Sequence, residues 1–294
     1  MLAAIPHLPE HQLAAHAAAY AAAVVEKRRR LVGGLILLVA LVWAAGWMGD
    51  VRPAVFVDNL GRFASYFGRL AHLDSGALVL SDPAEWFWGA KKWLRLIGET
   101  VLIAYLGTML GGVGAFLLCF HAARNVARTR WSAFLARRFL EFCRTVPELV
   151  FALIFVVAWG LGPLPGVLAL AIHTMGALGK LFAEVFENID MKPVDGIVAS
   201  GGNWVQAMRF GVLPQVTSNL ASYALLRFEI NVRGAAIMGF VGAGGIGQDL
   251  LEAVRKFYYS DVSAILVLIL VTVALIDIAT ERLRHALIGR ETRA

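Results

Sequence analysis

The sequence predicts an all-helical protein that is integral to a membrane. Of its 294 residues, 59% are hydrophobic and only 16% are charged, and the mean hydropathy is +0.68. Ordinary soluble domains carry about a quarter charged residues, and a soluble chain of this composition would expose large apolar patches. Six apolar runs are candidates for transmembrane helices, at 31–48, 97–120, 146–161, 167–182, 216–241 and 262–279.

The basic residues predict how these helices are oriented, because cytoplasmic loops carry an excess of Lys and Arg. A basic cluster at 27–30 precedes the first run, so we expect the amino end inside. The segment between the second and third runs, expected to be a loop, then falls on the cytoplasmic side, as does the tail after 279. The uncharged turn at 162–166 falls outside. Both chain ends are therefore expected in the cytoplasm.

Residues 1–95 are interpreted as an amino-terminal extension that holds the first helix and an interfacial segment. A secretory signal is an alternative for the first run, but Trp43 and Trp47 stand where a small-residue cleavage site is needed, which favours a retained helix. A later aromatic and basic cluster predicts a helix lying at the membrane surface; it comprises Trp86, Phe87, Trp88, Lys91, Lys92, Trp93 and Arg95. Residues 96–294 hold the other five runs.

Several function classes are excluded by the pattern. The net charge of +6 comes from residues beside apolar runs and not from a basic stripe with aromatics, so nucleic-acid binding is not expected. The two cysteines, Cys119 and Cys143, form neither a disulfide framework nor a metal-ligand spacing. No P-loop of the form GxxxxGK[ST] is present, so an ATP-driven mechanism would need a separate ATPase.

Glycine patterns in the apolar runs are interpreted as packing devices. Gly242, Gly244 and Gly247 match GxGxxG, the pattern of a dinucleotide site, but they follow a membrane helix in place of a strand. We expect them to form a tight turn with close helix approach. Gly107 and Gly111 form a GxxxG pair, which predicts close packing of the second run against a neighbouring helix.

A polar, glycine-containing segment at 187–214 separates two apolar runs on the predicted cytoplasmic side. Asn203 has the spacing of a capping box, so a short helix should begin there and end before Pro214. A preceding short helix should begin near Pro193 and be broken at Gly201. Such an element can move as a unit.

This segment resembles the cytoplasmic coupling loop of bacterial ABC-importer permeases. The pattern of that family is Glu-Ala-Ala, three residues, Gly, nine residues and Ile-any-Leu-Pro, and Gly201, Leu213 and Pro214 match its spacing. Asp195 stands in place of Glu, residues 196 and 197 replace the alanines, and Gly211 replaces Ile. The resemblance assigns contact with an ATPase to Asp195, Gly196, Ser200, Gly201, Gly202, Asn203, Leu213 and Pro214.

From about Gly98 to its end, the chain is similar to the permease subunit of phosphonate-type ABC importers. The motifs that carry this are RTVPELV at 144–150, GLGP at 160–163, LALAIH at 168–173, GKLF at 179–182, EINVR at 229–233 and GFVGAGGIG at 239–247. The resemblance implies a type I ABC importer permease fold at 96–294, in the bacterial inner membrane. It implies a translocation subunit that is not an enzyme and that moves phosphonate or a related phosphorus oxyanion by alternating access.

The same resemblance implies the partners. They are a second copy of this chain, two cytoplasmic ATPase subunits that bind ATP and Mg²⁺, and an extracytoplasmic substrate-binding protein. This chain itself is expected to bind no cofactor or metal and to have no catalytic residues.

Charged and titratable residues inside the apolar runs are candidates for a translocation pathway, because charges in the bilayer core usually face protein or water. Glu229 and Arg233 lie four apart on one helix face. They form either a structural ion pair or a pair in which Arg233 helps an anion pass. His173 and Lys180, seven apart, either line an anion route or, in the case of His173, make an interhelical hydrogen bond.

Two other function classes compete with the importer. A membrane-embedded enzyme would need acids, histidines or a nucleophile in a shared motif, and His173, Glu184 and Glu229 form none. An ion-coupled secondary transporter of a small anion is favoured only by intramembrane Glu229 and Asp277.

Overall fold

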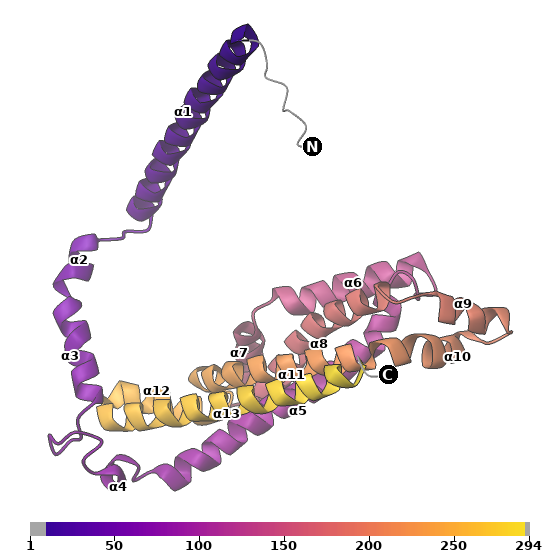
Figure 1. The fold of residues 1–294 in the computed structure, drawn as a ribbon. Helices are drawn as coiled ribbons and strands as arrows, with labels where there is room; N and C mark the ends of the chain where they lie inside the picture. Colours follow the sequence, from indigo (N-terminus) through magenta and orange to yellow (C-terminus); the bar gives the residue numbers. More distant parts are fainter. Residues whose placement is uncertain (1–9, 292–294) are drawn as a thin grey trace, which may run out of the picture. The chain divides into compact units, whose positions relative to one another are not determined.

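Residues 10–291 are described by the computed structural model, and they are almost entirely helical (Figure 1). Within this range the only strand-like pairing is an isolated bridge between His72 and Leu78. The predicted all-α class is confirmed. The first half consists of α1 (Glu10–Met48), α2 (Pro53–Asp58), α3 (Leu60–Leu70), α4 (Pro83–Trp86), α5 (Ala90–Ala122), α6 (Arg130–Thr145) and α7 (Glu148–Trp159). The second half consists of α8 (Pro163–Glu187), α9 (Lys192–Ala199), α10 (Trp204–Gln206), the π-helix η1 (Ala207–Val212), α11 (Leu213–Met238), the 3-10 helix η2 (Gly239–Val241), α12 (Ile246–Lys256) and α13 (Tyr259–Glu291).

Four of the described helices are long and apolar enough to cross a bilayer by themselves, namely α1, α5, α8 and α13. Two bent pairs bring the count to 6 over the same residues: α6 with α7, bent by 83°, and the segment Trp204–Val241 with α12, bent by 50°. The expectation of a separate span at 146–161 is wrong. The α7 helix has 12 residues, which is about 18 Å, against a hydrocarbon core of about 30 Å.

The basic segment between the second and third apolar runs is mostly helical, whereas the sequence analysis expected a loop. The hydroxyl of Thr129 accepts a hydrogen bond from the backbone N–H of Ser132 at 3.1 Å and caps α6. Small and apolar residues recur at helical spacing and are buried against α8, which explains the helix; they are Ala133, Ala136, Leu140 and Cys143. Cys143 is thus a buried helical residue.

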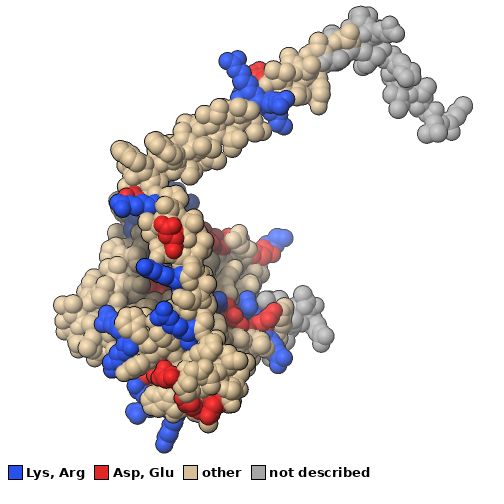
Figure 2. Space-filling model, turned by 90° about the vertical axis from the view of Figure 1, so that its left-hand side faces the viewer, with Lys and Arg blue, Asp and Glu red and all other residues tan. Residues whose placement is uncertain are grey.

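The chain divides into two compact units between Tyr66 and Phe67. In the first unit, the alanine-rich segment and the first apolar run form one continuous helix from Glu10. Figure 2 shows blue atoms gathered at one level of α1 beside a charge-free stretch. The basic cluster at 27–30 thus directly precedes the uncharged part of α1, residues 31–48, which is long enough to cross a bilayer. The boundary predicted after residue 95 stays a prediction, and residues 1–9 lie outside the described range.

The aromatic cluster before α5 differs from the single surface helix that its composition suggested. Trp86 ends α4, whereas Trp93 lies in the first turn of α5 and is 3% exposed. The indole N–H of Trp86 donates to the hydroxyl of Ser263 at 2.9 Å, and that of Trp88 donates to Asp261 at 2.8 Å. The cluster therefore packs onto α13, where the indoles of Trp86 and Trp88 find hydrogen-bond partners.

Close packing of α5 against α8 forms the centre of the second unit. A Cβ atom placed on Gly107 would lie 2.6 Å from the Cβ of Leu170, and one on Gly111 would lie 2.6 Å from the carbonyl oxygen of Ala171. No side chain fits at either glycine. The predicted packing role of the GxxxG pair is confirmed.

Replacing Gly111 by alanine is expected to destabilise the protein by about 1–3 kcal/mol, because the added methyl group overpacks the α5–α8 contact. Gly98 lies in the same helix, and a Cβ atom placed on it would have no neighbouring side chain or packed helix within 4 Å. Gly98→Ala should therefore be neutral or stabilising by up to about 1 kcal/mol. Thermal unfolding of the two purified variants in one detergent measures the difference. Equal unfolding temperatures would contradict the packing account.

The glycine-rich turn at 242–245 connects η2 to α12, and Gly247 lies in the first turn of α12. Gly242, Gly244 and Gly245 have positive φ angles of 83°, 83° and 78°, which side-chain-bearing residues rarely adopt. A Cβ on Gly166 at the start of α8 would lie 2.6 Å from the carbonyl oxygen of Ala243. The turn packs against the end of a neighbouring helix, as the sequence predicts.

Candidate functional site

The segment at 187–214 forms two short helices around a tight break. The α9 helix begins at Lys192, beside Pro193, and the chain reverses at Gly201 with a φ of +82°. The backbone N–H of Gln206 donates to Asn203 Oδ1 at 2.9 Å, and the backbone N–H of Asn203 donates to Gln206 Oε1 at 2.8 Å. The capping box, the start of α9 and the glycine break are all confirmed. We call residues 192–214 the coupling element.

The expectation that the second short helix ends before Pro214 is wrong. From Trp204 the chain continues through η1 directly into α11, and the backbone N–H of Leu213 donates to the carbonyl of Met208. Proline is tolerated here because it stands in the first turn of α11, where its missing N–H and fixed φ cost little. As a result, the coupling element is joined to a membrane helix without a flexible hinge.

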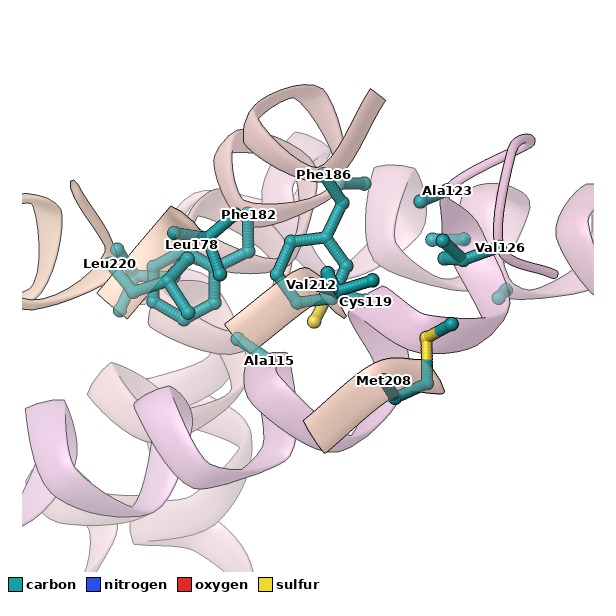
Figure 3. Close-up of a cluster of buried hydrophobic side chains, with 14 of the residues drawn as sticks. Ala115, Cys119, Ala123, Val126, Leu178, Phe182, Phe186, Met208, Val212 and Leu220 are labelled. Atoms are coloured by element: carbon teal, nitrogen blue, oxygen red, sulfur yellow. The ribbon is translucent and has the colours of Figure 1, made fainter. Parts of the chain in front are cut away.

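The inner face of the coupling element belongs to the same apolar core as α5 and α8 (Figure 3). Met208 and Val212 of η1 are 5% and 0% exposed, and they pack with Cys119 of α5 and Phe186 of α8. A Cβ on Gly211 would lie 3.0 Å from Cγ2 of Val194, so α9 also packs tightly on η1. Because packed cores transmit displacement, a movement of the coupling element is passed to α5, α8 and α11.

The short connection at 123–129 is also tied to the coupling element. The indole N–H of Trp204 donates to the carbonyl of Val126 at 3.1 Å, and the guanidinium of Arg128 lies 4.9 Å from the centre of the Trp204 ring. This is a cation–π geometry. The connection between α5 and α6 is thereby bound to the same element.

The outer face of the coupling element carries a groove of about 500 Å³. Its lining comprises Pro193, Gly196, Ile197, Ser200, Gly201, Gly202, Gln206 and Phe210. Phe210, which lines the groove, is 62% exposed, and Val198 of α9 and Val205 of α10 are 56% and 60% exposed. Of the residues predicted for ATPase contact, Gly196, Ser200, Gly201 and Gly202 line the groove. Asp195, Asn203 and Pro214 are exposed outside its lining, and Leu213 packs against the core.

A group of three charged or titratable residues lies near the middle of α8 and α11, facing the start of α7. His173 Nδ1 lies 2.9 Å from Glu148 Oε2 and 2.8 Å from a terminal nitrogen of Arg227, and that nitrogen lies 3.8 Å from Glu148 Oε2. The side chains are largely shielded, with Arg227 13%, His173 19% and Glu148 27% exposed. We call Glu148, His173 and Arg227 the intramembrane triad.

Sequence reasoning identified only His173 of this triad, and its predicted interhelical hydrogen bond is confirmed. Arg227 was missed, although an arginine inside the run at 216–241 is itself a signal, because such residues are rare in membrane segments. Glu148 was quoted as part of a motif but not as a pathway candidate. Its position at the amino end of α7, after the sharp bend, places it inside the protein.

The other predicted pathway residues lie at two separate places. Glu229 and Arg233 form the expected pair within α11, and Arg233 also lies 3.6 Å from Asp277 of α13. Lys180 pairs with Glu184 at 3.4 Å and lines a groove of about 130 Å³ together with Arg137 and Arg144. Lys180 does not meet His173.

A buried polar layer next to the triad holds three helices in register. The side-chain amide of Asn231 on α11 donates to Thr108 Oγ1 of α5 and to Thr174 Oγ1 of α8, each at 2.8 Å. All three residues are at most 1% exposed. Asn231 stands one turn from Arg227, and Thr174 follows His173, so this layer fixes the positions of two triad residues.

The chain matches a known family over most of the second unit. The family of binding-protein-dependent transport system inner membrane components matches residues 107–292. This chain belongs to that family. It is a permease subunit of an ABC importer, and a subunit of this kind translocates substrate and is not an enzyme. The phosphonate-type resemblance and the type I permease fold are confirmed.

The chain is also similar to individual transport permeases. The permease is 42% identical to the phosphite transport system permease protein PtxC of Stutzerimonas stutzeri, over 84% of this chain and 86% of that protein. It is 35% identical to the phosphate-import permease protein PhnE of Mycolicibacterium smegmatis, over 83% of this chain and 44% of that protein. A chain of the inward-facing MetNI methionine ABC transporter superimposes with a TM-score of 0.59 at 20% identity, over 70% of this chain and 98% of that one.

Proposed function

We propose that this permease imports a phosphorus oxyanion, such as phosphonate, phosphite or phosphate, across the bacterial inner membrane. Its similarity to permeases named for phosphite and phosphate supports this substrate class. The motor is a pair of cytoplasmic ATPase subunits, which bind ATP and Mg²⁺, and a second copy of this chain completes the pathway. An extracytoplasmic binding protein delivers the anion. The chain itself binds no cofactor.

The geometry of the coupling element carries this proposal. Its outer face presents a groove with an exposed aromatic side chain, Phe210, its inner face lies in the core shared by α5 and α8, and η1 continues into α11. When ATP closes the two ATPase subunits, the coupling elements of the two permeases move together, and the attached helices reorient to face outward. Hydrolysis resets them. This is alternating access driven by rigid-body movement.

Reconstitution into liposomes tests the proposal. The permease, a cognate ATPase and a cognate binding protein are combined or left out one at a time, and uptake of phosphite, methylphosphonate and phosphate is measured. We expect uptake only when all three proteins and ATP are present. Uptake by this chain alone, driven by a proton or sodium gradient, would identify an ion-coupled carrier and refute the importer.

Replacing Arg233 by alanine is expected to impair uptake while membrane insertion stays intact. Arg233 neutralises Glu229 and lies near Asp277, and its side chain is 48% exposed, so it can meet a passing anion. The measurement is uptake by the reconstituted complex together with the amount of variant in the membrane. Normal uptake would remove Arg233 from the pathway and leave its pair with Glu229 as a structural feature.

A further inference from the structure

The intramembrane triad contains a ring nitrogen with two partners that it cannot satisfy at once. Nδ1 of His173 lies 2.9 Å from a Glu148 oxygen and 2.8 Å from an Arg227 nitrogen. A guanidinium nitrogen only donates, an ionised carboxylate oxygen only accepts, and a ring nitrogen carries either a proton or one lone pair. With a proton, Nδ1 donates to Glu148 and offers Arg227 nothing. Without one, it accepts from Arg227 and leaves Glu148 unbound.

The guanidinium of Arg227 has more donors than nearby acceptors. Its Nε is buried and has no hydrogen-bond partner among residues 10–291. The Glu148 oxygen at 3.8 Å is close enough for an ion pair but too far for a hydrogen bond. A buried donor without an acceptor is destabilising, because the hydrogen bond that it made to water is not replaced. The guanidinium is therefore a fork with unused donors, the geometry that binds oxyanions in a bidentate manner.

The position of Glu148 explains how this arginine is tolerated in the membrane. Glu148 stands in the first turn of α7, and a Cβ on Gly234 of α11 would lie 2.8 Å from its Oε1, so the carboxylate rests directly against the backbone of α11. It supplies the negative charge that a buried arginine needs. Its chemistry resembles that of an oxyanion, but its distance from Arg227 prevents full hydrogen bonding.

We propose that Arg227 binds the transported oxyanion inside the permease and that Glu148 is its resident counter-ion, which is displaced when the anion arrives. This inference rests on the proposed import of an oxyanion. In the resting state His173 accepts from Arg227. When Nδ1 carries a proton, His173 binds Glu148 instead and Arg227 is free to hold the anion through Nε and a terminal nitrogen. The competing carboxylate keeps anion binding weak, which allows release.

Direct binding of phosphite to the purified permease–ATPase complex, without binding protein, tests this inference. Glu148→Gln removes the competing charge but keeps an oxygen that accepts from a protonated His173, so it is expected to bind phosphite about tenfold tighter than the wild type if the carboxylate holds Arg227 for about nine tenths of the time at rest. Arg227→Met should abolish binding, and the double variant should lose the gain. Glu141→Gln, at a glutamate paired with Arg138 on α6, is the matched control and should leave affinity unchanged.

The outcomes separate this inference from the proposed function. Unchanged or weaker binding by Glu148→Gln, or a gain that survives in the double variant, would overturn the role of the triad even if the wild-type complex imports phosphite. Failure of the wild type to import any oxyanion would refute the proposed function instead. If Arg227→Met does not fold, Arg227→Lys replaces it in the cycle. Lysine keeps the charge but loses the fork, so the gain should shrink.

Discussion

Replacing Phe210 by glutamate is expected to abolish co-purification of the ATPase subunit with the permease. Phe210 is 62% exposed and lines the groove on the outer face of the coupling element. A large aromatic side chain in an interface groove is a typical hot spot, and its loss costs at least about 2 kcal/mol, or about thirtyfold in affinity. The added carboxylate would also be desolvated on docking. ATP-driven uptake should fall in parallel.

The control for this prediction is Leu80→Glu. Leu80 is 78% exposed and precedes α4, at the opposite end of the second unit from α9 and α10 (Figure 1). The Leu80→Glu variant also removes an exposed apolar side chain and adds the same charge, but far from the groove, so ATPase binding should not change. Full retention of the ATPase by Phe210→Glu would place the motor somewhere other than this groove.

Replacing Asn231 by aspartate is expected to produce the largest loss of stability. A carboxylate cannot donate to Thr108 and Thr174, and a charge at a membrane helix centre costs roughly 3 kcal/mol. Asn231→Leu removes two hydrogen bonds that are worth about 0.6 kcal/mol each in membranes, so its effect should be smaller. In detergent, the unfolding temperature should be highest for the wild type, lower for Asn231→Leu and lowest for Asn231→Asp.

Asn219→Asp serves as the control for Asn231, since Asn219 is an exposed asparagine on the same helix. Its unfolding temperature should match that of the wild type. An Asn231→Asp variant as stable as Asn219→Asp would mean that the polar layer does not hold α5, α8 and α11 together.

Features that depend on neighbours in sequence were predictable. The capping box at Asn203, the glycine break at Gly201 and the GxxxG contact at Gly107 each follow from local backbone chemistry. The apolar runs gave the membrane class for a similar reason, because a bilayer demands a minimum apolar length.

Features that depend on bends and on distant contacts were not predictable. The run at 146–161 looked like a whole span because hydrophobicity does not reveal the 83° bend between α6 and α7. That bend carries Glu148 to His173 and Arg227, which lie 25 and 79 positions away in the printed sequence (148 to 173 and 148 to 227). Likewise, Pro214 suggested a helix end, whereas the preceding π-helix lets the chain continue.

Site-specific labelling of the coupling element tests the central claim most directly. A cysteine is placed at Val205, which is 60% exposed, in a chain whose buried Cys119 and Cys143 are replaced by alanine. We predict that a membrane-impermeant thiol reagent labels it only from the cytoplasmic side, and that a short crosslinker joins it to the ATPase subunit. Labelling from the outside, or a complex that hydrolyses ATP and transports without ever forming this crosslink, would contradict the account.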